Sequence, residues 1–230
     1  IWKYPERTLT WFPPRLWDIG ILNSIYGSEP AGLLSSLLKE GGSILIWVMY
    51  YTPPDYVKKE AGANFVEDGF TRDIPGYVIE GHVTTGWDRI VYWLKDISSY
   101  DEILMLSGML STTSDNVAPF ITIGADVDNH YRVSLCVYET AEDFKLEKVV
   151  GGSASLLASE GVDLSANTNY PVAFYYRRTD GRMLVWRSGG KKFDLTDTDI
   201  SPTYVGIGMF TNSTTTLTVK LNNPIVVVAK

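Results

Sequence analysis

Carboxylates are the first side chains to consider, because cleavage of a glycosidic bond needs two of them, roughly 5 to 9 Å apart. Glu139, Glu142 and Asp143 come nearest to such a pair in this chain of 230 residues. They straddle a predicted turn instead of following one strand, so their side chains are expected in a solvated loop. The sequence therefore predicts that the chain is not an enzyme.

The sequence gives little support for nucleophilic catalysis or for a zinc site. A Ser-His-Asp site would need His82 or His130, and no Gly-x-Ser-x-Gly turn precedes either of them. His82 is expected on a strand surface and His130 in a turn. Two histidines and the single Cys136 do not make a zinc site, and one cysteine forms no intrachain disulfide. Cys136 lies in an apolar run and is expected to be a small buried group.

Calcium is the one cofactor that the sequence leaves open. A calcium ion binds several oxygen ligands from carboxylates and carbonyls. Asp126, Asp128 and Asn129 lie at a predicted turn between strands and could supply them, and a second acidic cluster follows at residues 194–199. Neither cluster matches an EF-hand loop. Because Asp and Asn also favour turns for backbone reasons alone, a Ca²⁺ site and a plain turn both remain open.

Aromatic side chains give the strongest indication of ligand binding. Tyr175, Arg177 and Trp186 are expected on one face of a β-hairpin, and Trp87 and Trp93 on or near an earlier strand. Exposed rings stack on the faces of sugars while flanking polar groups bind the hydroxyls. These five residues form the predicted ligand-binding set. The alternative is that the rings are core, or are covered by the N-terminal arm and helix.

The hairpin that carries three of these residues is predicted over residues 170–195. Asp180-Gly181 is expected to form a two-residue type I′ turn, which needs positive φ at both positions. Such a turn would pair Tyr176 with Val185 and Tyr175 with Trp186. Side chains alternate across a strand. The predicted faces are Val172, Phe174, Tyr176, Met183 and Val185 on one side, and Ala173, Tyr175, Arg177, Leu184 and Trp186 on the other.

Residues 1–64 are predicted to be an N-terminal unit that packs on the rest of the chain or on a neighbouring copy. Residues 1–27 contain three tryptophans and Pro13-Pro14, so an extended arm is expected. Ser28 to Glu40 is predicted to be a short amphipathic helix that Ser28 caps and Gly41-Gly42 ends. The apolar stretch from 43 to 52 is predicted to be a buried strand, and the stretch from 53 to 64 is polar and charged, with one helical turn as an option.

From residue 65 onward, short strands separated by turn residues are predicted, and no further helix, which is typical of a sandwich or barrel. Besides the hairpin, the predicted strands are residues 76–84, 89–94, 103–110, 120–125, 131–139, 145–149, 155–158, 203–210 and 214–228, the last with a break at Asn222-Asn223-Pro224. Asn212-Ser213-Thr214 is a glycosylation sequon in a predicted hairpin turn.

The order of several segments resembles a known superfamily. The segments are FVEDGF (65–70), GYVIEGHV (76–83), the strand from Asp128 to Leu135 with its N-x-Y-x-V-x-L pattern, FKLEKVV, LLASEGVDL, the hairpin, and the closing LTVKLNNPIVVV. Together they resemble the concanavalin A-like lectin/glucanase superfamily, in its laminin-G-like branch, over residues 65–230. The resemblance implies an all-β jelly roll of two antiparallel sheets that binds glycans or proteins, often with Ca²⁺. Some members are glycosidases and others are structural proteins, so fold alone does not select a function.

Composition excludes some partners. The net charge is −7 and the pI is about 4.9, which argues against nucleic acid, because phosphate binding needs clustered Lys and Arg. No run approaches the roughly 20 apolar residues that span a bilayer. The chain starts at Ile1, and a removed signal peptide would fit this start. An extracellular, cell-surface or virion-surface location is expected, although the single cysteine leaves the compartment open.

Two functions agree with these observations. The first is a non-catalytic carbohydrate-binding module whose partner is a glycan or a protein surface. The second is a self-assembling structural subunit of a virion, filament or surface layer. In that case residues 1–30, or the terminal strand Thr214 to Val228, would pair with a second copy.

Overall fold

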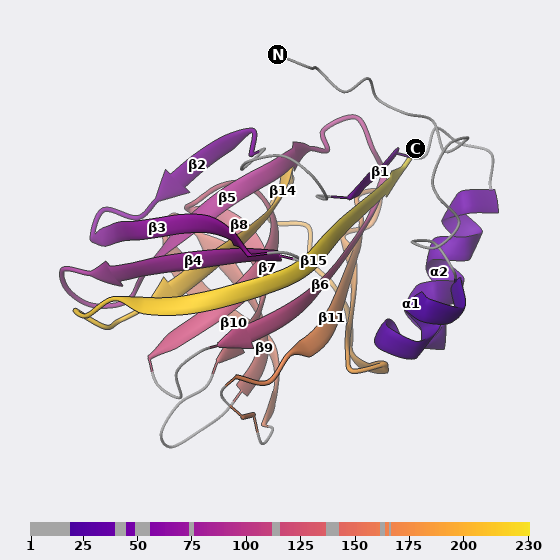
Figure 1. The fold of residues 1–230 in the computed structure, drawn as a ribbon. Helices are drawn as coiled ribbons and strands as arrows, with labels where there is room; N and C mark the ends of the chain where they lie inside the picture. Colours follow the sequence, from indigo (N-terminus) through magenta and orange to yellow (C-terminus); the bar gives the residue numbers. More distant parts are fainter. Residues whose placement is uncertain are drawn as a thin grey trace, which may run out of the picture.

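The structure is a computed structural model that describes residues 19–39, 45–48, 56–73, 76–111, 116–136, 143–161, 164–165 and 167–230. This described part is a sandwich of two antiparallel β-sheets with two helices at its side (Figure 1). The expected all-β jelly roll is confirmed. Within the same residues, no helix is long and apolar enough to cross a membrane.

Sheet A contains the hairpin and the C-terminal strand. Its strands, in spatial order, are β13 (Gly190–Thr196), β12 (Arg182–Arg187), β11 (Tyr170–Arg177), β6 (Glu102–Ser111), β15 (Leu217–Ala229), β4 (Gly76–Val83) and β3 (Phe65–Asp73), and β1 (Leu45–Val48) pairs with β15 beside this path.

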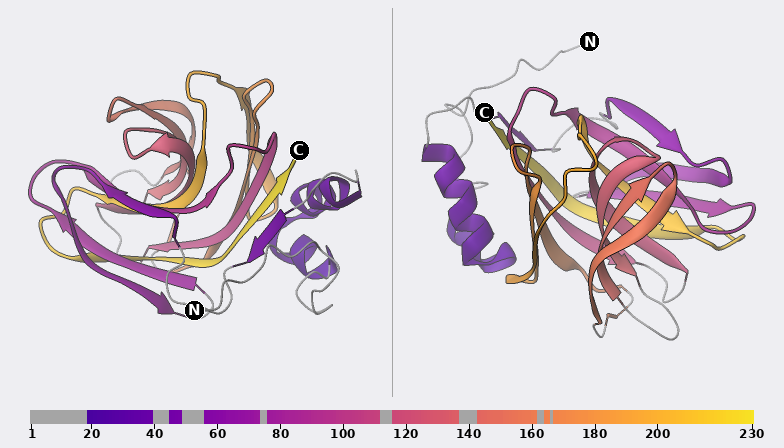
Figure 2. Two further views of the ribbon diagram at one scale, coloured as in Figure 1. Left: turned by 90° about the horizontal axis from the view of Figure 1, so that it is seen from above. Right: turned by 180° about the vertical axis from the view of Figure 1, so that it is seen from behind.

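Sheet B lies opposite sheet A. Its strands, in spatial order, are β10 (Ser153–Gly161), β9 (Asp143–Val150), β8 (Asn129–Cys136), β7 (Val117–Asp126), β14 (Tyr204–Thr211), β5 (Asp88–Asp96) and β2 (Lys58–Ala61). Figure 2 shows that the strands of this sheet curve strongly, most of all from β8 to β10.

The main core fills the space between the sheets, because every second side chain of each strand points inward. Ile79 and Phe174 of sheet A meet Tyr92, Ile121 and Val133 of sheet B there, and all five are fully buried. Burial of each such side chain contributes about 1.5–3 kcal/mol. Because the apolar face of each strand packs into this core, its opposite face points outward.

The hairpin of β11 and β12 has the predicted faces but a different register. Tyr176 pairs with Met183 and Ala173 with Trp186, so the loop covers residues 178–181. In this loop, Gly181 has a φ of +67° but Asp180 has no positive φ, so the predicted type I′ turn is wrong. The observed pairing differs from the predicted one by two residues. An even shift keeps every side chain on its face, and for this reason the predicted faces survive.

The helices differ partly from expectation. α2 (Ser28–Lys39) confirms the predicted helix, but α1 (Ile19–Tyr26) occupies residues that were expected to be extended. The prolines that argued against a helix precede α1, whose sequence IGILNSIY contains none. Gly27, with a φ of +90°, separates the two helices and donates from its N–H to Asn23 O at 3.0 Å, as a glycine helix end does. Residues 1–18 of the predicted arm lie outside the described residues.

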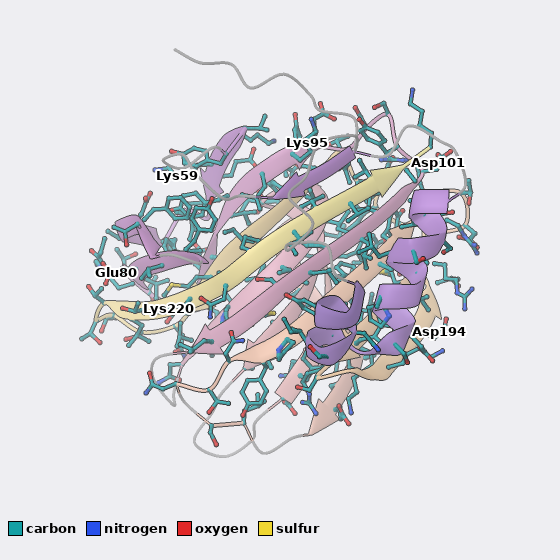
Figure 3. All side chains as sticks on the ribbon, turned by 45° about the vertical axis from the view of Figure 1, so that its right-hand side comes forward. Lys59, Glu80, Lys95, Asp101, Asp194 and Lys220 are labelled. Atoms are coloured by element: carbon teal, nitrogen blue, oxygen red, sulfur yellow. The ribbon has the colours of Figure 1, made fainter. Side chains whose placement is uncertain are left out.

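Both helices lie against the outer face of sheet A. Their buried side chains pack with apolar residues of β6, β11, β12 and β15 in a second cluster: Tyr26, Ala31, Leu34, Leu37, Leu104, Leu106, Ala173, Tyr175, Trp186, Ile225, Val227 and Ala229. In Figure 3 the helices cover the half of the sheet nearer Asp194, whereas Glu80 and Lys220 mark the half that they leave open.

The first 64 residues contribute to both sheets. β1 pairs with β15 in sheet A, and β2 pairs with β5 in sheet B, although no strand was predicted over residues 53–64. β15 runs through the predicted break at residues 222–224 as one strand, with a shift in its pairing to β6 between Asn222 and Ile225. It lies between β6 and β4, so most of its length has neighbours on both sides.

Candidate functional site

The rings of Tyr175 and Trp186 share a face, as predicted, but this face lies beneath the helices. Tyr175 is 4% exposed and Trp186 is 2% exposed. The indole Nε1 of Trp186 donates to Glu29 Oε2 of α2 at 2.8 Å, and Tyr175 Oη donates to Glu102 Oε2 at 2.8 Å. Burial and this bond to Glu102 raise the pKa of the Tyr175 hydroxyl. Neither ring is open to a ligand while α2 covers it.

Arg177 lies at the end of the same face and serves the loop that follows. Its guanidinium holds Asp180 through two hydrogen bonds, at 2.9 and 2.6 Å. These bonds lower the pKa of Asp180 to about 2. Asp180 Oδ1 also accepts from Arg182 N at 3.2 Å, so the pair orders the loop between β11 and β12.

Trp93 belongs to the outer face of sheet B and is completely buried there. Its Nε1 donates to Glu60 Oε2 at 2.8 Å, and the same oxygen accepts from Val127 N at 2.9 Å. The ring lies over β14, where a side chain at Gly206 would approach Trp93 Cε3 to 3.0 Å. A glycine at this position therefore makes room for the indole on the sheet.

Sheet B is curved so that the turns between β7 and β8 and between β9 and β10 reach the outer face of β5. Arg89 of β5 donates to the carbonyls of Val127 and Gly152 and to Asp128 Oδ1, at 2.8, 3.2 and 2.9 Å. Those three acceptors lie in the turns between β7 and β8 and between β9 and β10. Because one arginine ties both turns to β5, the rings beneath them form a small closed core.

Trp87 is the one member of the predicted ligand-binding set with a largely open ring. It is 47% exposed, at the start of β5. Its ring centroid lies 5.6 Å from that of Phe210, and Arg132 lies 4.1 Å from the Phe210 ring on the same face of sheet B. Arg132 Nε in turn donates to Glu147 Oε2 at 2.8 Å. The half-exposed indole of Trp87 therefore lies beside a layer of buried aromatic and charged side chains.

Trp87 lies in one of three turns that are joined to one another by hydrogen bonds. Thr84 N donates to Asn64 O at 2.9 Å, and Asn64 N donates to Asp88 Oδ2 at 2.7 Å. Val83 N donates to Ser213 O at 2.8 Å, which attaches the turn between β14 and β15. We call this surface the Trp87 rim: Trp87, Phe210, Arg132 and the turns at residues 62–64, 84–88 and 211–216.

The turns of the rim carry polar side chains. Asn64 and the threonines at 84, 85, 214, 215 and 216 are exposed, whereas Thr211 is buried, and no lysine or arginine occurs in the three turns. Asn212 Oδ1 is buried within the rim, and no described residue donates a hydrogen bond to it. Trp87 is a candidate from the sequence, whereas Arg132 and Phe210 are not. Both lie at outward positions of strands whose pairing was not known, and only their period-two alternation could have marked them.

Asp126, Asp128 and Asn129 do lie together at the turn between β7 and β8. Asp126 Oδ1 accepts from Asp128 N and from Asn129 Nδ2, both at 2.9 Å, and Asn129 Oδ1 accepts from Gly151 N at 3.2 Å. In the described residues, no group of three or more His, Cys, Asp or Glu side chains is arranged to hold a metal ion. A calcium ion here would have to replace these hydrogen bonds and the Asp128–Arg89 pair, so calcium binding stays a prediction.

The second acidic cluster holds an ion pair. Lys148 Nζ donates to Asp197 Oδ2 at 2.7 Å and also to Asp199, and Tyr131 Oη donates to Asp197 Oδ1 at 2.5 Å. Burial opposes ionisation of Asp197, but the bonds from Lys148 and Tyr131 outweigh it and lower its pKa. A general acid of a glycosidase needs a raised pKa, so this pair does not suit that role. Glu139 and Glu142 lie outside the described residues.

The two histidines have different surroundings. His82 Nδ1 lies 2.8 Å from Asp68 Oδ2, and Thr216 donates to the same oxygen at 2.6 Å. His130 is fully buried in sheet B, and among the described residues no group meets the geometry of a hydrogen bond with either ring nitrogen, although the backbone of Asp126 and Val127 acts on the ring. Burial first, and then Arg132 and Arg89, hold the pKa of His130 well below its usual value, so the ring is neutral.

No protein-family model matches the sequence, and no curated protein matches it. Solved structures do resemble it. Peanut lectin has a TM-score of 0.53 at 8% identity, over 81% of this chain and 97% of the lectin. The carbohydrate-binding module CBM66 of Bacillus subtilis has a TM-score of 0.50 at 14% identity, over 70% of this chain and 93% of the module. The CBM2 module of the evolved Dit of Lactobacillus casei BL23 phage J-1 has a TM-score of 0.51 at 11% identity, over 81% of this chain and 90% of the module. The protein therefore has the concanavalin A-like jelly-roll fold.

Proposed function

We propose that the protein is a non-catalytic carbohydrate-binding module that binds glycans at the Trp87 rim. The observation that carries the proposal is the half-open indole of Trp87, set among turns of Asn, Ser and Thr. An indole offers a flat apolar face to the C–H groups of a sugar ring, and hydroxyl and amide groups beside it suit the sugar hydroxyls. The lectins and carbohydrate-binding modules that share this fold support the same class of ligand.

The other four predicted binding residues lie outside the Trp87 rim. Trp93 belongs to the closed core of sheet B, and Tyr175 and Trp186 lie beneath α2. Arg177 orders a loop of sheet A. We propose that Trp87 makes the direct contact with the glycan, and that the protein acts in an extracellular or surface setting.

The proposal is tested by replacing Trp87 with alanine. A glycan array of neutral, amino and sialylated sugars identifies the strongest ligand, and calorimetry then measures its affinity. We expect Trp87→Ala to weaken binding at least about tenfold, because truncating an aromatic anchor typically costs more than 1.4 kcal/mol. Val57→Ala, which also removes an exposed apolar side chain, should leave both affinity and Tm unchanged.

Two results would contradict the proposal. One is an array without any binding at protein concentrations of about 100 μM, a range that still detects weak single-site lectins. The other is a bound glycan whose affinity is the same for Trp87→Ala and the wild type. Trp87→Phe, which keeps a smaller ring, should retain part of the binding if stacking is the cause.

A further inference from the structure

Of the four strands that end the two sheet paths, one lacks the charges that protect the other three. The short β1 (LIWV), which pairs with β15 beside the path of sheet A, is also uncharged. The two sheet paths end in β13 and β3 for sheet A and in β10 and β2 for sheet B. β13 (GKKFDLT), β3 (FVEDGFTRD) and β2 (KKEA) each carry at least three charged residues, whereas β10 (SASLLASEG) carries one. Exposed edges present unpaired N–H and C=O groups, and charged side chains are the usual means of preventing further strand pairing.

The single charge of β10 is engaged within the molecule. Glu160 accepts from Lys192 Nζ at 2.8 Å and lies 3.3 Å from Arg187 Nη2, both in sheet A. Residues 153–159 therefore form a neutral edge of serine, alanine and leucine. A bulge between Leu156 and Ala158 bends the far end, and residues 153–156 remain a regular stretch.

Exposed apolar side chains gather on this hairpin. Leu156 of β10 is 56% exposed, and Val150, at the end of β9, is also exposed. Leu156 pairs with Glu147 and Ala154 with Val149 across the β9–β10 ladder, so Ala154 and Leu156 point to the same, outer face of sheet B. An unprotected edge with an apolar stripe on one face favours addition of another strand.

We propose that β10 pairs with β10 of a second copy of the chain, antiparallel, so that sheet B continues across a two-fold axis at Ser155. Opposite residues of an antiparallel pair share a face, so this register sets Leu156 of each copy against Ala154 of the other. Ser155 faces its own equivalent. No like charges meet at this junction, and the interface is isologous, as two-fold symmetry requires.

The size of the junction sets its strength. The regular stretch covers four residues before the bulge, so the buried area is small and lies in the range of weak, transient interfaces. The dimer is therefore expected to form and dissociate with concentration. β15, the strand first expected to pair with a neighbour, lies between β6 and β4 and has no such open edge over most of its length.

Sedimentation velocity of the full chain over a hundredfold concentration range tests the proposal. We expect the wild type to move from monomer to dimer, and Leu156→Lys and Ser155→Pro to stay monomeric. Val57→Lys is the matched control, because it adds the same charge at another exposed apolar position, and it should dimerise like the wild type. A wild type that stays monomeric throughout, or a Leu156→Lys variant that dimerises normally, would overturn the proposal.

A disulfide tests the register independently of stability. Cys136 is buried, so a new thiol at Ser155→Cys is the accessible one among the described residues. The two-fold axis brings this thiol to its own equivalent, and mild oxidation should give a covalent dimer. Ser188→Cys, in the turn between β12 and β13, should not cross-link. Equal cross-linking of both variants would show random collision instead of strand pairing.

Discussion

Replacing Gly27 with alanine is expected to loosen the helix pair from sheet A. Gly27 joins α1 to α2 with a φ of +90°, a conformation that alanine rarely adopts. A Cβ at this position would lie 2.6 Å from both Cα and O of Gly189, in the turn between β12 and β13. Both contacts are with backbone, so no change of rotamer relieves them.

The expected loss follows from two contributions. The left-handed conformation costs alanine about 1–2 kcal/mol. Overpacking against a rigid neighbour adds about 1–3 kcal/mol, which gives about 2–5 kcal/mol in total. The helices can also undock, so the free energy of docking limits the loss. Docking buries Leu34 and Leu37, and each side chain contributes about 1.5–3 kcal/mol. The strain and the free energy of docking are therefore of similar size. We expect the helices to leave sheet A in part of the molecules.

Thermal unfolding and tryptophan fluorescence measure the outcome. Each kcal/mol lowers Tm by about 2–4 °C in a domain of this size. Release of α2 would also expose Trp186, and the emission should move to longer wavelength. Gly32→Ala is the matched control, because a Cβ there meets no atom within 4 Å, and it should raise stability by about 0.5–1 kcal/mol. A Gly27→Ala variant with the Tm and emission of the wild type would refute the reasoning.

Two further predictions concern polar groups, the buried His130 and the half-buried Arg178. The pKa of His130 is lower in the folded state than its unfolded value of about 6.5, so the unfolded chain binds the extra proton and stability is lost as pH falls below that value. Between pH 7 and pH 5 we expect a loss of about 2 kcal/mol from this group in urea unfolding, and His130→Phe should remove that part of the pH dependence. Arg178 donates to the carbonyls of Ile97, Tyr100 and Pro202, and Arg178→Met should lower the free energy of unfolding by about 3 kcal/mol or more. An Arg178→Met midpoint within 0.5 kcal/mol of the wild type, on the scale of exposed substitutions, would contradict this.

The faces of the strands could be predicted from the sequence, but not their register. Alternation has a period of two, so Phe174 and Tyr176 had to share one side and Tyr175 the other, whichever turn closed the hairpin. The register depends on loop geometry, which the Asp180-Gly181 pair suggested wrongly. The position of Gly181 in the left-handed region was correct, but it closes a longer loop.

Exposure of the rings was harder to predict, because an aromatic face looks the same in sequence whether it binds a ligand or a helix. Trp186 is covered by α2, whose leucines supplied the matching apolar surface. Trp93 lies in β5 and Trp87 directly before it, yet the first is fully buried and the second is 47% exposed. What separates them is the curvature of sheet B, which Arg89 fixes through contacts with residues far away in the sequence.

The two proposed surfaces are compatible with each other, and together they predict bivalent binding. The residues that pair in the proposed dimer, 154–156, include none of the residues that define the Trp87 rim, so we expect pairing at β10 to leave the rim free. A dimer then presents two rims, and linked sites bind a glycan-coated surface more tightly than either does alone. Ser155→Pro should therefore keep the affinity for a free glycan but dissociate faster from a dense glycan surface. Equal dissociation of variant and wild type, at concentrations where the wild type is dimeric, would show that the second rim cannot reach the same surface.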